Sequence, residues 1–173
     1  MDGRFGFIHE KIDIKILILF VMGHLSEPVD LDTLTGLALC DDGISYFDFA
    51  ECVGELIMTE HLFTDGTYYR ITEKGLKNGK ITENGIPYSV RLKAGKNAAA
   101  MRAKQSRASM IKTSRNIRRK GGYTVNVALS DGIDEIISMS LYAVNENQAA
   151  ALEEGFKNHA EHIYSTVIEA ILK

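Results

Sequence analysis

The hydrophobic positions of residues 10–61 recur with the period of three short helices. The first predicted helix covers residues 10–25 and is apolar nearly all round, which is typical of a helix at the centre of a core. It ends before Pro28, since proline cannot continue a helix. The second covers residues 31–39, and Asp30 precedes it as a preferred N-cap residue.

The third predicted helix follows Ser45, another preferred N-cap residue, with Asp48 three positions later. One side of this helix carries an apolar stripe that we expect to pack inward: Phe49, Val53, Leu56 and Ile57. Cys52 lies at the margin of that stripe and is expected to be a packed, reduced thiol. The opposite side carries three carboxylates: Asp48, Glu51 and Glu55.

Residues 61–71 predict a β-hairpin, because Asp65-Gly66 is a favoured turn pair between two alternating segments. Three helices followed by a hairpin predict a winged helix-turn-helix domain over residues 1–82. Residues 83–173 then form the second predicted region, which we expect to mediate dimerisation or regulation.

This second region begins with a predicted long helix over residues 88–120, which is rich in alanine and free of proline. Residues 123–144 alternate between apolar and polar and contain an Asp-Gly turn, so they predict an antiparallel β-hairpin. Asn145 then caps a C-terminal helix, with Gln148 completing a capping box. The fold class is therefore α+β. The small alanine side chains along one side of the long helix would allow a second helix to approach closely. We therefore expect a homodimer.

Several short segments resemble known bacterial proteins. The hairpin ending YYRITEKG, residues 68–75, resembles the wing of PadR-like and MarR-like regulators. Together with GIPYSVR, GGYTVNVAL and HIYSTVIEAIL, it resembles nearly the full length of a family of small bacterial proteins of unknown function, described as winged-helix transcriptional regulators. This resemblance implies the winged-helix fold and a role in transcription regulation, and it implies no chemistry.

The charges are segregated along the chain, although the net charge is only −3. Residues 84–130 contain 11 lysine and arginine residues and no aspartate or glutamate. We call this stretch the acid-free segment. Such a stretch indicates an anionic partner, which is either nucleic acid or the acidic ends of the protein itself.

Double-stranded DNA is the expected partner of a winged helix, with the N-terminus of the third helix at the base edges. The candidate DNA-binding residues are therefore Ser45, Tyr46 and Phe47 on that helix, Arg70 in the hairpin, and the densest cationic cluster, Arg115, Arg118, Arg119 and Lys120. Residues 16–69 contain no lysine or arginine, so the usual docking mode has little support.

Two other interpretations remain open. The acidic side of the third helix could be solvated, or it could dock onto the basic helix 88–120 within the chain or across a dimer. The basic cluster could pair with the acidic C-terminal helix instead of binding DNA. In that case the protein would be a winged-helix protein–protein interaction module or a dimeric adaptor without DNA binding.

Catalysis and metal binding have little support in the sequence. His159 and His162 are three residues apart but lack a third nearby ligand, so we expect no metal, no cofactor and no enzymatic activity. Nothing in the sequence identifies a small-molecule effector. The longest apolar run, residues 16–22, is far too short to span a membrane, and no signal peptide is predicted, so we expect a cytoplasmic protein.

Overall fold

The computed structural model describes residues 7–173 and divides into two compact units. The first unit extends to Gln105 and the second covers Ser106–Lys173. This division lies inside helix α5, Tyr88–Met110, and differs from the boundary predicted near residue 82. The physical reason is that the first turns of α5 belong to the core of the first unit, where Val90 and Ala94 are buried.

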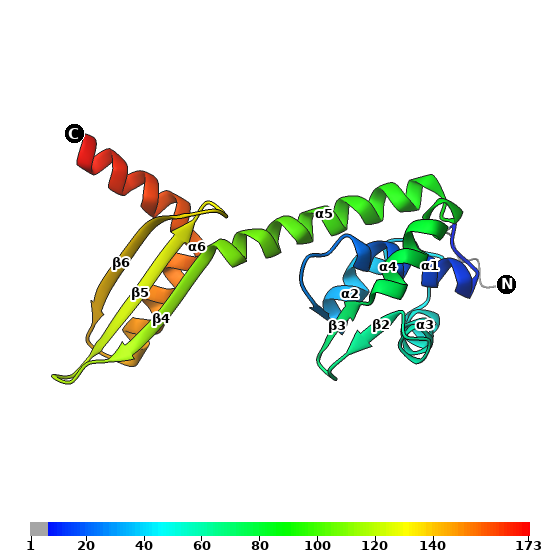
Figure 1. Cartoon of the computed structure of the whole chain (residues 1–173), viewed down its shortest axis with the longest axis horizontal. Coiled ribbons are helices and arrows are strands. Elements are labelled where there is room, and N and C mark those ends of the chain that lie inside the picture. The colour runs from blue at the N-terminus through cyan, green and yellow to red at the C-terminus, as the bar shows by residue number, and fades with distance from the viewer. Residues whose placement is uncertain (1–6) are drawn as a thin grey trace. The chain divides into compact units, whose positions relative to one another are not determined.

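The first unit is built around helix α1, Lys11–Gly23, which contacts three further helices (Figure 1). These are α2, Leu31–Ala38, α3, Tyr46–Met58, and α4, Glu73–Thr82, which a short 3₁₀ helix, η1, Glu83–Gly85, follows. The central position of α1 explains why its sequence is apolar on nearly every side. The predicted stripe on α3 is confirmed, since Phe49, Val53 and Leu56 are buried.

The small sheet of the first unit contains strands β1, Val29–Asp30, β2, Leu62–Thr64, and β3, Tyr68–Ile71. The strands are antiparallel and β3 lies between the other two. The predicted Asp-Gly turn joins β2 to β3, with the Asp65 carboxylate accepting from the backbone N–H groups of Thr67 and Tyr68. The short strand β1 was not predicted from the sequence.

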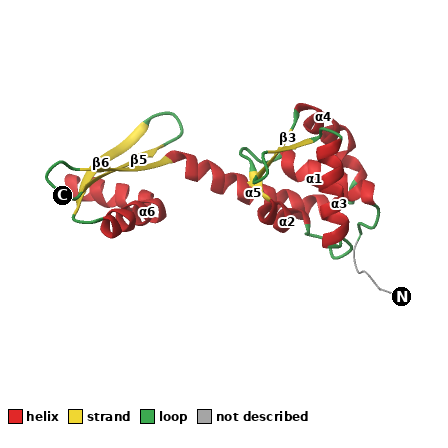
Figure 2. Cartoon of the chain, turned by 90° about the horizontal axis from the view of Figure 1, so that it is seen from below, coloured by secondary structure: helices red, strands yellow, loops and turns green. Residues whose placement is uncertain are grey.

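The second unit is a three-stranded antiparallel sheet with one long helix on one face (Figure 2). The strands are β4, Ile111–Ile117, β5, Tyr123–Ser130, and β6, Glu135–Ala143, in the order β4-β5-β6. Helix α6, Glu146–Leu172, packs against the buried side chains of the sheet, and its backbone is kinked at His159. The chain is therefore α+β, and within residues 7–173 it has two small antiparallel sheets.

The helix predicted over residues 88–120 is wrong after residue 110. Helix α5 ends at Met110 and the next seven residues form β4. The physical reason is long-range pairing, because β4 forms a full ladder with β5, from Ile111 opposite Leu129 to Ile117 opposite Tyr123. This pairing outweighs the local helix preference of the alanine-rich segment before it.

The N-cap residues expected from the sequence are confirmed. Asp30 and Ser45 accept hydrogen bonds from the backbone N–H groups of Thr33 and Asp48, at 2.7 and 3.0 Å. Asn145 caps α6 in the same way, with the N–H of Gln148 at 2.9 Å. Each cap satisfies a backbone donor that the helix itself leaves unpaired.

Candidate nucleic-acid interface

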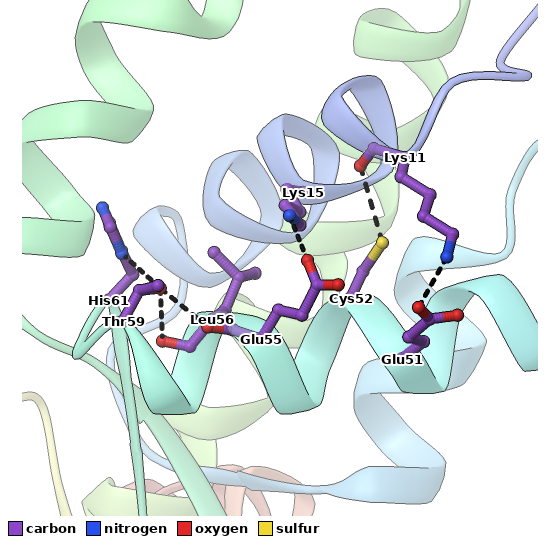
Figure 3. A network of polar contacts seen from close by, with 8 residues as sticks. All are labelled: Lys11, Lys15, Glu51, Cys52, Glu55, Leu56, Thr59 and His61. Carbon is purple, nitrogen blue, oxygen red and sulfur yellow. Dashed lines mark hydrogen bonds and ion pairs between the residues drawn. The ribbon is translucent and has the colours of Figure 1, made fainter.

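The acidic side of α3 faces helix α1 and not the basic helix. Glu51 lies 2.6 Å from the ammonium group of Lys11, and Glu55 forms an ion pair with Lys15 (Figure 3). The hydrogen bond from Lys15 lowers the pKa of the Glu55 carboxyl, and the hydrogen bond to Glu51 raises the pKa of Lys11. The hypothesis that this acidic side docks onto helix 88–120 within the chain is therefore wrong for these two carboxylates.

Cys52 lies between these two ion pairs and is fully buried (Figure 3). Its Sγ lies 3.5 Å from the backbone oxygen of Lys11, and burial raises the pKa of the thiol. A thiol with a raised pKa is rarely ionised at neutral pH, so it is a poor nucleophile. Cys52 is a packed side chain of the helix interface, as the sequence predicted.

The solvent-facing side of α3 is apolar and uncharged along most of its length. Phe47 is 76% exposed and Met58 is 77% exposed, and Ala50 and Gly54 lie between them at helical spacing. Tyr46 is also exposed at the first turn. A helix face of this composition has no cation to attract a phosphate.

The side chain of Ser45 forms its hydrogen bonds within the first turn of α3. Its hydroxyl accepts from the backbone N–H of Asp48 and donates to the Asp48 carboxylate at 2.5 Å. Both hydrogen-bonding roles of the hydroxyl therefore stabilise the start of α3. Of the three candidate residues on this helix, only Tyr46 and Phe47 present an unbonded surface to solvent.

Arg70 lies on β3 beside the hairpin turn. Its guanidinium group packs 4.5 Å from the centre of the Phe63 ring, which lies on β2. The ring holds the cation at the surface of the hairpin, where it remains exposed. Of the cations predicted from the sequence to bind DNA, Arg70 is the one that lies in the first unit.

The remaining candidate residues lie in the second unit and do not form one helical cluster, because residues 111–117 are a strand. Arg115 points toward α6, where it lies 3.8 Å from Glu146 and 3.9 Å from Glu153. Arg118 packs 5.0 Å from the centre of the Tyr142 ring. Arg119 and Lys120 are exposed in the turn between β4 and β5.

Most cations of the acid-free segment are left without a carboxylate. Within residues 7–173, only Arg107 and Arg115 of this segment form ion pairs. Arg107 binds Glu161 with two hydrogen bonds of 2.7 Å. The C-terminal helix therefore neutralises these two arginines and leaves the others available to an external anion.

The outer face of the second sheet was missed by sequence reasoning. It lies opposite α6, and the only carboxylate among the paired residues of its three strands is Glu135, opposite Ser130 at the end of the ladder. Three rows of facing residues cross it: Lys112, Ala128 and Ser138; Ser114, Asn126 and Ser140; Asn116, Thr124 and Tyr142. The sequence pattern that could have indicated this face is the alternation in residues 111–117, where lysine, serine and asparagine occupy every second position.

The part of the chain that the structure describes contains no cluster of three or more His, Cys, Asp or Glu residues able to hold a metal ion. His159 and His162 both lie at the rim of a groove between β6 and α6. Among the described helices, none combines the length and the hydrophobicity that a bilayer crossing requires.

These features define an α+β protein with two units, an apolar helix face in the first and a mainly polar outer sheet face in the second. Residues 14–171 match the family described as Domain of unknown function (DUF4364), and the chain belongs to this family. No curated protein and no solved structure matches the chain.

Proposed function

We propose that this protein is a transcription regulator that binds double-stranded DNA as a homodimer, and that its first unit is a winged helix-turn-helix. The order of helices α1, α2 and α3 followed by the β2–β3 hairpin supports this proposal. The position of β3 between β1 and β2 is consistent with a wing that packs beside three helices. The resemblance of residues 68–75 to regulator wings supports the same interpretation.

The observation that carries the DNA-binding proposal is the set of unneutralised cations in the acid-free segment. DNA affinity depends mainly on lysine and arginine at the phosphates. Ion pairs with Glu161, Glu146 and Glu153 occupy only two of the 11 cations among the described residues. The others include exposed groups on α5 and in the β4–β5 turn: Lys96, Arg102, Lys104, Arg119 and Lys120.

The same cations determine the mode of binding that we propose. Because α3 has no lysine or arginine, the phosphates would be held by the acid-free segment and by Arg70. Tyr46 and Phe47 would be the α3 side chains near the bases. Phosphate contacts position a protein on DNA without reading the sequence, so the affinity would depend steeply on salt and only weakly on base sequence.

The test is duplex DNA binding by fluorescence anisotropy at low and moderate salt, with matched double variants. Arg119→Ala with Lys120→Ala removes two exposed cations from the acid-free segment. Lys77→Ala with Lys80→Ala removes two exposed cations from α4, outside the segment. The first variant should bind more weakly and with a flatter salt dependence, whereas the second should resemble the wild type. If both variants bind DNA as tightly as the wild type, the β4–β5 turn has no role in DNA binding.

A second candidate function has its own observation. The exposed apolar face of α3 is suited to a protein partner, since apolar and aromatic residues are enriched at the centres of interfaces. Under this alternative the first unit is a winged-helix interaction module, and the protein is a dimeric adaptor. It predicts no binding to duplex DNA even at low salt.

A further inference from the structure

The two edges of the second sheet differ in chemistry. The edge strand β4 carries Lys112 and Arg115, and Arg115 connects this edge to α6 through Glu146 and Glu153. The other edge strand, β6, has no lysine, arginine or proline, and its only charged residue is Glu135 at its first position. Natural proteins protect exposed edges with charges and prolines, so a nine-residue edge whose single charge lies at its first position is suited to pairing with another strand.

An apolar groove of about 550 Å³ runs beside the β6 edge. Met139 and Leu141 line it from the strand, and Leu152, Phe156 and Ile163 line it from α6. The groove exists because α6 packs mainly over β4 and β5 and leaves the β6 side less covered (Figure 1). The kink at His159, with φ −129° and ψ 18°, lies at this groove.

We propose that β6 pairs antiparallel with β6 of a second copy of this chain, so that two three-stranded sheets become one six-stranded sheet. This inference rests on the proposed function, in that it names the interface of the proposed homodimer. A full overlap of the nine residues centres on Met139, which then lies opposite the partner's Met139. Nine residues of paired strand extend over about 30 Å.

The sequence of β6 is complementary to itself in this register. Ile137 faces the partner's Leu141 on the groove side, and Ser138 faces the partner's Ser140 on the outer side. Glu135 faces the partner's Ala143, so no like charges meet. Cross-strand pairs of aliphatic residues and of hydroxyl residues stabilise antiparallel sheets.

The same pairing covers the groove. A two-fold axis perpendicular to the joined sheet places both α6 helices on the same face, on either side of the β6 pair. The groove residues Met139 and Leu141 of the two copies then meet beneath the helices. The exposed edge and the exposed groove are therefore buried by one contact, and this continuity favours a second copy over an unrelated partner.

The first test is the oligomeric state of the full chain by sedimentation equilibrium at micromolar concentration. Ser138→Lys with Ser140→Lys places lysine opposite lysine across the proposed axis, at exposed positions of the sheet. Ser114→Lys with Asn116→Lys adds the same charges on the same sheet face at the other edge. We expect the wild type and the β4 variant to be dimers and the β6 variant to be a monomer. Circular dichroism checks that each variant is folded.

A mixing experiment separates repulsion from misfolding. Ser138→Glu with Ser140→Glu should also be monomeric alone, and an equimolar mixture with the lysine variant should restore the dimer. A wild-type monomer, or a β6 lysine variant that dimerises as well as the β4 variant, would overturn the proposed interface.

Disulfide trapping tests the register. Met139→Cys should form a disulfide-linked dimer under mild oxidation, because the two cysteines would face each other. Thr113→Cys is the matched control. Thr113 pairs with Val127, which in turn pairs with Met139, so Thr113 and Met139 lie in one row at opposite edges of the sheet. Both native cysteines are buried and give little background. Crosslinking of Thr113→Cys in place of Met139→Cys would assign the interface to the β4 edge and contradict the proposal.

The two proposals fail in distinguishable ways. A wild-type monomer that binds duplex DNA would overturn the β6 interface and leave the DNA contact standing. A dimer that depends on β6 but does not bind DNA would overturn the proposed function and leave the interface standing.

Discussion

Arg107 near the end of α5 and Glu161 on α6 form a bidentate ion pair, with the Nε and Nη2 atoms of the arginine each 2.7 Å from a carboxylate oxygen. The pair joins the last turn of α5 to the helix that covers the sheet. The hydrogen bond from Arg107 lowers the pKa of Glu161 below its usual value of 4.5. The pair therefore makes stability depend on pH.

The sign of this dependence follows from the lowered pKa. A carboxyl group whose pKa is lower in the folded state stabilises the fold above its unfolded pKa and loses this contribution as the pH falls through the folded value. Glu161→Gln should lower Tm slightly at neutral pH and should reduce the loss of Tm on acidification below about pH 4.5. Thermal unfolding followed by circular dichroism between neutral and acidic pH measures both effects.

Glu169→Gln is the matched control for this prediction, because Glu169 is exposed on the same helix and has no ion pair within the described chain. Its pH profile should follow the wild type. If Glu161→Gln and Glu169→Gln behave alike, the ion pair does not contribute to stability.

The Lys15–Glu55 pair should couple α1 to α3. Either single reversal, Lys15→Glu or Glu55→Lys, places two like charges together and should lower Tm. The double variant restores opposite charges and should recover most of the loss, which a double-mutant cycle measures. Additive losses in the double variant would show that the two side chains do not interact.

Gly75 and Gly54 should respond oppositely to alanine. A Cβ at Gly75 would overlap the backbone oxygen of His61, whereas a Cβ at Gly54 would meet no atom within 4 Å. Gly75→Ala should lower the free energy of unfolding by about 1–3 kcal/mol, as overpacking does. Gly54→Ala should raise it by up to about 1 kcal/mol, because alanine favours the helix. Urea denaturation measures both, and equal effects would contradict the packing around Gly75.

The apolar face of α3 should contribute little to stability. Phe47→Ser with Met58→Ser changes two exposed side chains, so the free energy of unfolding should change by less than about 0.5 kcal/mol for each. If the acid-free segment holds the phosphates, this variant should also keep the salt dependence of DNA binding. Loss of that salt dependence would instead assign the main DNA contact to α3.

The sequence predicted those parts of the fold that local chemistry determines. Asp30, Ser45 and Asn145 were recognised as caps because a cap depends on a few neighbouring residues. Strand β4 was missed because its pairing with β5 is a contact across the sheet, and the alanine-rich segment before it favours a helix.

The candidate site was predicted less completely. The unneutralised cations of residues 84–130 follow from composition, since the segment supplies no carboxylate of its own. The partners of Glu51 and Glu55 could have been found, because Lys11 and Lys15 have the same spacing of four residues on α1. The outer face of the second sheet could not be predicted while residues 111–117 were expected to be helical, because strand β4 supplies one edge of that face.

The salt dependence of wild-type binding to a duplex of random sequence tests the central claim most directly. Each phosphate contact contributes about −0.9 to the slope of log K against log salt concentration. We predict measurable binding at low salt, with a slope steeper than about −3, because several cations of the acid-free segment would contact phosphates. No binding at low salt, or binding that is independent of salt, would contradict the proposal that this segment holds DNA.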